Sequence, residues 1–178
     1  MEAGIATEQF ADHLREVQVE FVNPFLSALN QTLQSMGRTT ASKGSIRLTK
    51  INIFSADALI FMRIDGAIKG IVILELPEEI AKKFVSQFLL GVPIIELDEM
   101  ARNSLIEFSI RISEKAKGRL VQRGYLSNVS SNINFYKPLQ FSRDRQFIVV
   151  PLNTEFGSFN VFFHVMKTDV IERRELPN

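Results

Sequence analysis

The sequence contains no cysteine and no tryptophan, and it has only 2 tyrosines and 2 histidines among 178 residues. Without cysteine there can be no disulfide, no thiolate metal site and no cysteine nucleophile. The polar N-terminus lacks the apolar core of a signal peptide, so we expect a cytoplasmic protein. The most apolar run, residues 71–76, is far shorter than the roughly 20 residues of a membrane-spanning helix, and no membrane partner is expected.

The sequence also lacks an excess of charge of one sign. Its 21 Lys and Arg residues and 20 Asp and Glu residues leave a net charge of +1. This balance gives no overall attraction to nucleic acid. The basic residues are dispersed without interleaved aromatics, so we expect no nucleic-acid partner.

Sequence signatures of common metal, cofactor and hydrolase sites are missing too. His13 and His164 lie far apart and have no second ligand at metal spacing, so we interpret them as a surface and a packed histidine. The glycines in residues 66–70 turn a hairpin and do not lead into a helix, which argues against a phosphate loop. No nucleophile elbow is present. We therefore expect no metal and no cofactor.

Phenylalanine, in contrast, is abundant, with 15 residues, and the hydrophobic fraction is 46%. This length and composition predict one domain with a phenylalanine-rich core. Short connections such as the turn at Asp65-Gly66 favour antiparallel pairing, so the predicted fold class is α+β, a mostly antiparallel sheet with long helices packed on it. Periodicity predicts helices over residues 7–21, 24–37, 77–91 and 98–124, and strands over residues 46–53, 59–64, 67–76, 126–137, 147–152 and 158–166.

Two local features of this assignment matter below. Asn23 suits an N-cap and Pro24 a first helical position, but whether the first two helices form one kinked rod stays open. Residues 138–145, with the sequence PLQFSRDR, are expected to form a loop.

The helix expected over residues 98–120 has one narrow apolar stripe. At about 100° per residue, the stripe contains Ala101, Leu105, Phe108, Ile112 and Ala116. Ile110 lies about 160° from its centre, on a mostly polar face. An isoleucine there indicates a contact surface. A second layer of the fold, or a stray surface isoleucine, would also explain it, and periodicity alone favours these two interpretations.

Glu107 lies on the same face, with Asn103 four residues before it and Arg111 four residues after it. Side chains at this spacing can meet on a helix. A surface ion pair of small energy is the favoured interpretation. The functional alternative is a carboxylate that grips a partner's cation, with a carboxamide placed to orient a water molecule.

Four segments of the chain carry a family resemblance. They are residues 22–28 (VNPFLSA), 68–81, 107–120 and 150–159 (VPLNTEFGSF). Taken in order, they resemble the CheX family of chemotaxis proteins, part of the CheC/CheX/FliY group. The resemblance implies a single CheX-like domain over residues 21–170, with an extra N-terminal helical extension at residues 1–20 and a C-terminal tail at residues 171–178.

The resemblance also implies a function. The CheC/CheX/FliY group dephosphorylates the phospho-aspartate of the response regulator CheY with a Glu-x-x-Asn pair on an exposed helix face. The glutamate anchors a lysine of the regulator, and the asparagine orients the attacking water. The magnesium belongs to the regulator, so the resemblance implies no cofactor of the chain's own. It further implies a CheY-like regulator as partner, and a homodimer joined through the sheets.

In this chain the pair is incomplete. Glu107 falls on the glutamate position, but Ile110 falls on the asparagine position and Ile106 replaces the usual glycine. Isoleucine has no hydrogen-bond donor or acceptor and cannot orient water. We therefore expect a two-component signalling protein that binds a CheY-type regulator, with weak or no phosphatase activity. The expected partner-binding residues are Asn103, Ile106, Glu107, Ile110, Arg111 and Glu114, and the catalytic residue implied by the resemblance is Glu107.

Two alternatives stay open. The protein could be an active CheY-P phosphatase that uses Glu107 with a non-standard water-positioning residue. Asn103, one turn earlier, would serve only with a shifted docking pose. The chain could also be a structural homodimeric interaction module, with the outer face of the helix buried between protomers.

Overall fold

The computed structural model describes residues 17–167. The expected extension at residues 1–20 lies mostly outside this range, and His13 and the tail at residues 171–178 lie wholly outside it. Within the range, no helix is long and apolar enough to cross a lipid bilayer. The elements in chain order are the π-helical turn η1 (Gln18–Val22), α2 (Asn23–Gly37), β1 (Ser42–Lys43), β2 (Arg47–Phe54), β3 (Ala58–Gly66), β4 (Ile68–Leu76), α3 (Glu78–Phe88), α4 (Glu99–Gln122), β5 (Ser127–Phe135), β6 (Leu139–Thr154) and β7 (Gly157–Lys167).

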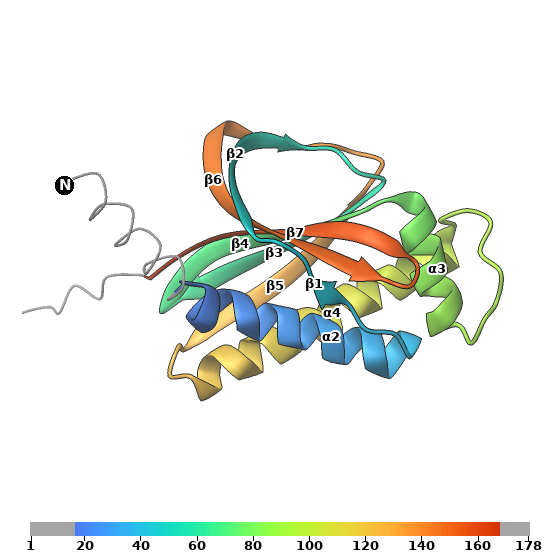
Figure 1. Cartoon of the computed structure of the whole chain (residues 1–178), viewed down its shortest axis with the longest axis horizontal. Helices are drawn as coiled ribbons and strands as arrows, with labels where there is room; N and C mark the ends of the chain where they lie inside the picture. The colour runs from blue at the N-terminus through green and yellow to red at the C-terminus, as the bar shows by residue number, and fades with distance from the viewer. Residues whose placement is uncertain (1–16, 168–178) are drawn as a thin grey trace, which may run out of the picture.

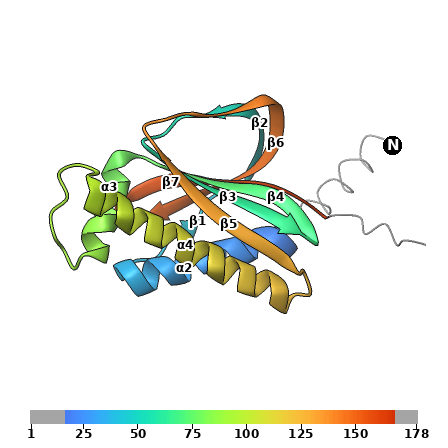
Figure 2. The ribbon, with the colours of Figure 1, turned by 180° about the vertical axis from the view of Figure 1, so that it is seen from behind.

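The strands form one seven-stranded antiparallel sheet. Its order is β1-β6-β7-β4-β3-β5, and β2 pairs with the earlier part of β6. Helices α2 and α4 pack against each other across one face of the sheet, as Figures 1 and 2 show from opposite sides. The α+β class and the antiparallel pairing predicted from the sequence are confirmed.

Strand β6 begins inside the segment that was expected to be a loop. Gln140 lies opposite Ile53 and Arg145 opposite Ile51 of β2, so the loop predicted over residues 138–145 is wrong. The run SRDRQ shows no apolar alternation because most of its side chains are exposed, and backbone pairing with β2 makes it a strand. Residues 49–54 of β2 and residues 139–147 of β6 form a two-stranded arm that curls away from the helices (Figure 1).

Hydrophobic cores lie on both faces of the sheet. The first, on the helical side, includes the fully buried Leu33, Ile60, Met62, Phe84, Phe108 and Phe163. The second lies under the arm and consists of Phe54, Leu59, Ile71, Ile73, Phe147, Val149 and Phe162. In the second core, the ring of Phe54 packs edge to face against the rings of Phe162, Phe147 and Phe141, at centroid distances of 4.9, 5.2 and 6.1 Å. Phenylalanine contributes to both cores, as its abundance predicts.

The helical start of the described chain is continuous. The π-helical turn η1 runs directly into α2, and Val22 at the junction has helical dihedral angles. Asn23 makes no side-chain cap, in contrast to the prediction, because the residues before it are already helical and leave no free helix end. Pro24 stands just after the junction of η1 and α2, where it contributes no N–H to the helical hydrogen bonds.

The turn between β3 and β4 requires glycine at one position for steric reasons. Gly66 has φ of +136°, and a Cβ atom at this position would come within 2.6 Å of the carbonyl oxygen of Leu126. A side chain would therefore be strained and would clash with backbone. The hairpin expected at Asp65-Gly66 is present.

Helix α3 begins where Pro77, Glu78 and Glu79 predict a start, but its cap comes from another part of the chain. The Asp57 Oδ2 atom accepts a hydrogen bond from the backbone N–H of Glu78 at 2.8 Å. The register of β3 against β4 pairs Ala58 with Leu76, which brings Asp57 to the end of β4. The cap thus depends on strand pairing and has no local sequence signal.

Helix α4 is capped locally and held on two sides. The Asp98 Oδ1 atom accepts from the backbone N–H of Ala101 at 2.8 Å, a regular N-cap. The helix packs on α2 and on β5, and the apolar stripe predicted over residues 101–116 is buried. Ser109 lies on the β5 side, where its hydroxyl donates to the hydroxyl oxygen of Ser131 at 3.3 Å. This packing fixes which face of α4 points outward.

Candidate functional site

The outward face of α4 carries all of the residues that the sequence predicts for partner binding. These residues, Asn103, Ile106, Glu107, Ile110, Arg111 and Glu114, are exposed. Ile106 and Ile110 each keep 40% of their surface accessible. A second layer over Ile110 is therefore ruled out within the described part of the chain, and the two isoleucines, at i and i+4, form a short apolar ridge.

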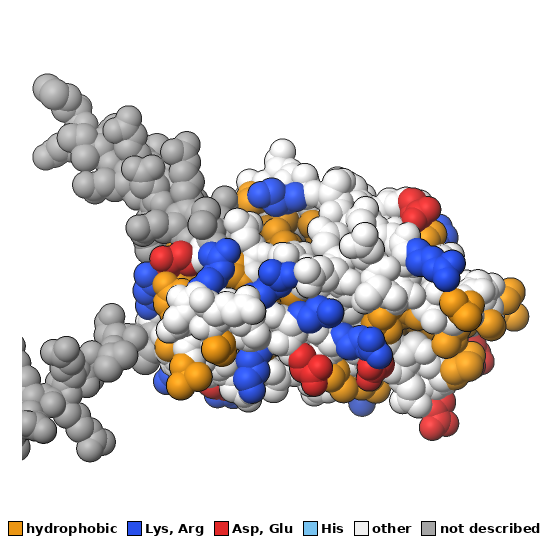
Figure 3. Space-filling view, turned by 90° about the horizontal axis from the view of Figure 1, so that it is seen from below, with side chains coloured by type: hydrophobic (Ala, Val, Ile, Leu, Met, Phe, Trp, Pro, Cys, Tyr) orange, Lys and Arg blue, Asp and Glu red, His pale blue; other side chains and the backbone are white. Residues whose placement is uncertain are grey.

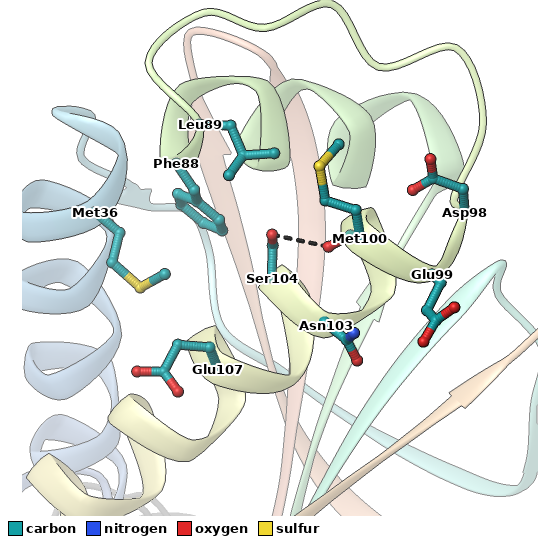
Figure 4. Close-up of a pocket in the computed structure, with 9 residues that line it drawn as sticks. All are labelled: Met36, Phe88, Leu89, Asp98, Glu99, Met100, Asn103, Ser104 and Glu107. Carbon is teal, nitrogen blue, oxygen red and sulfur yellow. Dashed lines mark hydrogen bonds between the residues drawn. The ribbon is translucent and has the colours of Figure 1, made fainter.

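Glu107 is engaged by its own helix. The Arg111 Nε atom donates to the Glu107 Oε1 atom at 2.6 Å, and both side chains are about half exposed, at 50% each. This is the i,i+4 ion pair that the sequence predicts. Asn103 does not hydrogen-bond to Glu107, although both line the same depression (Figure 4). The structure thus joins Glu107 to Arg111 and leaves the Asn103 carboxamide in the open.

The depression lies where the end of α2, the end of α3 and the start of α4 meet. Its volume is about 800 Å³, and it is broad and open. Figure 4 shows Met36 entering from α2, and Phe88 and Leu89 from the end of α3. The remaining lining residues come from the start of α4 and its cap, namely Asp98, Glu99, Met100, Asn103, Ser104 and Glu107. Apolar side chains thus face a rim with three carboxylates.

The apolar part of this depression was not predicted from the sequence. Met36, Phe88 and Met100 belong to three helices, and only packing brings them together. A sequence signal was available in Phe88-Leu89-Leu90, an apolar triplet at a helix end, which exceeds what one helix face can bury.

The depression continues into an exposed apolar corner, which we call the α3–α4 corner and define as Leu90, Val92, Ile95 and Met100. These side chains are 85%, 47%, 86% and 49% exposed. Figure 3 shows hydrophobic side chains gathered at this end of the helical side. The neighbouring surface carries both basic and acidic side chains. Apolar side chains gathered in this way on a polar surface are typical of a contact site.

The side chains on this face are suited to contact with a protein partner. Ile110 offers no donor or acceptor to a water molecule. The Glu107 carboxylate already has a cationic partner in Arg111. In the described part of the chain, no group of three or more His, Cys, Asp or Glu side chains could hold a metal ion. The face combines an apolar ridge, one ion pair and one free carboxamide.

No protein-family model matches the sequence, and a comparison with curated proteins finds no sequence match. Solved structures are similar in fold. The chemotaxis protein CheX from Desulfovibrio desulfuricans matches with a TM-score of 0.71 and 21% identity, over 83% of this chain and 99% of that one. A CheC-like superfamily protein from Shewanella sp. PV-4 matches with a TM-score of 0.72 and 22% identity, over 83% and 98%.

A third similar structure is the CheX–CheY–BeF3–Mg²⁺ complex from Borrelia burgdorferi, in which the matched chain gives a TM-score of 0.66 and 16% identity, over 83% of this chain and 98% of that one. These similarities cover nearly the whole of each matched chain and agree with the resemblance predicted from the sequence. At such identities they establish architecture, and the chain therefore has the fold of the CheX and CheC-like chemotaxis proteins.

Proposed function

We propose that this protein binds a response regulator of the CheY type through the outward face of α4 and the α3–α4 corner, with little or no phosphatase activity. The observation that carries the proposal is the exposure of Ile110 beside Glu107, on the outer helix of a CheX-like fold. The similar protein from Borrelia burgdorferi was crystallised with CheY, which supports the choice of partner.

The arrangement of side chains suits a small protein interface. Interfaces gain most of their affinity from a few central apolar or aromatic contacts surrounded by a polar rim. Ile106 and Ile110 would form such a centre, with Arg111 and Glu114 at its border. The Glu107–Arg111 pair is exposed, and pairs of this kind contribute only about 0.5 kcal/mol. Glu107 could therefore release Arg111 and pair with a lysine of the regulator at little cost in free energy.

The same residues explain the expected lack of catalysis. Hydrolysis of an acyl phosphate is accelerated when a side chain holds water in line with the phosphorus, and isoleucine cannot do this. We propose that the chain uses no metal or cofactor of its own, and that any Mg²⁺ in the complex is carried by the regulator.

The test uses the full chain and a CheY-type regulator from the same organism. We expect calorimetry to show saturable binding that tightens when the regulator is activated with beryllofluoride. A phosphoryl-release assay should then give the regulator's own rate, with or without this protein. Absence of binding to the activated regulator would refute the proposed function, whereas accelerated release would refute only its non-catalytic part.

An active phosphatase is the second candidate, because Glu107 is exposed at the position implied by the family resemblance. If the main proposal is correct, Ile110→Asn should raise the rate of phosphoryl release by about 10- to 100-fold, because it restores a water-orienting carboxamide. Ile106→Asn is the matched control, because Ile106 is also 40% exposed but lies outside the Glu-x-x-Asn spacing. If the wild type already accelerates release above the regulator's own rate, and as much as Ile110→Asn does, the phosphatase candidate replaces the main one.

We also propose that the protein is a homodimer joined through its sheets. Within the described residues, β5 pairs on one side only, with β3, and so offers a free strand edge. Sedimentation equilibrium should give twice the chain mass of 20.2 kDa at micromolar concentration. A species of the chain mass at all concentrations would contradict the dimer.

A further inference from the structure

A second cavity, which we call the arm cavity, lies on the sheet face away from the helices. Its volume is about 330 Å³, and it is bordered by β3, β4, β7 and the β6 part of the arm. Lining residues Phe61, Ile71 and Phe141 belong to or pack against the second core. The arm cavity is therefore separated by the sheet from the α4 face on which the proposed function rests.

The charges around the arm cavity do not cancel. Arg63, Lys69 and Arg145 line it, together with one acid, Asp65. The Arg63 Nε atom lies 2.8 Å from the Asp65 Oδ2 atom, so these two charges neutralise each other. Lys69 and Arg145 take part in none of the ion pairs among residues 17–167. The cavity thus carries two uncompensated positive charges.

Arg145 also holds an unsatisfied hydrogen-bond donor. Its Nε atom is buried and has no hydrogen-bond partner, and it is the one such side-chain nitrogen or oxygen found in the described range. The guanidinium lies over the ring of Phe141, with 4.9 Å between the guanidinium carbon and the ring centroid. Stacking keeps the cation in place but supplies no acceptor. Because Nε itself is buried, an oxyanion in the cavity would meet the other guanidinium atoms of Arg145 and supply the missing negative charge.

The remaining walls are apolar or neutral. Phe61 and Phe141 are half-buried and offer aromatic surface. The Nδ1 atom of His164 lies 2.9 Å from the carbonyl oxygen of Gln146, so this nitrogen carries the proton in the neutral ring. The half-buried His164 ring also packs against the ring of Phe147, with 5.7 Å between centroids, which agrees with the sequence-based interpretation of a packed histidine. The cavity therefore combines cationic groups with aromatic walls.

We propose that the arm cavity binds a small organic anion, a carboxylate or phosphate monoester attached to a flat apolar body. Arg145 and Lys69 hold the oxyanion, and the body lies against Phe61 and Phe141. Inorganic anions bind more weakly because they leave the aromatic walls uncovered. Neutral aromatic compounds bind more weakly because they leave Arg145 and Lys69 uncompensated.

The test titrates the ¹⁵N-labelled full chain with phenyl phosphate, benzoate, inorganic phosphate and benzyl alcohol. The readouts are the Nε–Hε resonance of Arg145 and the dissociation constant from calorimetry. We expect one of the two aromatic anions to saturate a single site and to shift that resonance, and which of them binds tighter separates phosphate from carboxylate. Inorganic phosphate and benzyl alcohol should each bind at least about tenfold more weakly.

Arg145→Gln should weaken binding of the aromatic anion by about tenfold or more, the loss expected for one charged hydrogen bond. Arg143→Gln is the matched control, since Arg143 is exposed on the same strand and does not line the cavity, and it should change affinity by less than about twofold. If circular dichroism shows that Arg145→Gln fails to fold, Lys69→Gln replaces it as the cavity variant. No saturable binding of either aromatic anion, or equal losses in the cavity and control variants, would overturn the proposal. Regulator binding at α4 should be unchanged in all three variants.

Discussion

Substitution of Ile110 by aspartate is expected to weaken binding of an activated CheY-type regulator by about 100-fold. The change removes an apolar side chain that is 40% exposed at the centre of the proposed contact, and it places a carboxylate one turn from Glu107. Loss of a central interface residue costs about 2–4 kcal/mol, and 100-fold corresponds to about 2.7 kcal/mol. Calorimetric titration of the regulator into both proteins measures the change.

Val121→Asp is the matched control for this experiment. Val121 lies on the same outward face of α4, is 44% exposed, and stands three turns further along the helix. A charge there should change affinity by less than about threefold, since rim positions contribute little. Equal losses of affinity in the two variants would show that a negative charge anywhere on α4 weakens binding and that Ile110 is not the centre of the interface.

Substitution of Phe54 by alanine should lower the free energy of unfolding by about 3–5 kcal/mol, the range for a large aromatic removed from a core. Phe54 is fully buried, at 0% exposure, and its ring contacts three others in the second core. It ends β2, so its loss also weakens the arm's hold on the sheet. Urea denaturation followed by far-ultraviolet circular dichroism measures the change.

Ile53 is the comparison position, because it is adjacent in β2 and 46% exposed. Ile53→Ala should cost about 0.5 kcal/mol or less, as surface substitutions do. If Phe54→Ala were as mild as Ile53→Ala, the second core would not have the packing described above. The regulator affinity of folded Phe54→Ala should stay unchanged, because the arm and α4 lie on opposite faces of the sheet.

Because its two cores lie on opposite faces of the sheet, this protein has two separate candidate binding surfaces. The helical side presents the α4 face and the α3–α4 corner, while the arm side encloses a small cationic cavity. Because the sheet separates them, each can be altered by substitution without direct contact with the other. The regulator and anion experiments therefore report on independent sites, and failure of one leaves the other proposal intact.

Periodicity and local chemistry were enough to predict much of the fold and part of the candidate site. The buried stripe of α4, the outward position of Ile110 and the Glu107–Arg111 pair depend on helical spacing alone, and they agree with the structure. The hairpin at Gly66 likewise depends on a local backbone conformation. Each of these features involves residues close in sequence, whose relative positions are fixed once the element forms.

Features built across the chain had no such signal. The strand in residues 139–145 exists because β2 pairs with it. The cap of α3 is Asp57, an aspartate that precedes β3. The depression beside α4 joins Met36, Phe88 and Met100 from three helices. The sequence by itself determined most of the helical and extended segments and which side of α4 is apolar. Only the tertiary structure decided which exposed groups stand together, because proximity between distant segments is set by packing and strand register, and periodicity carries no information about either.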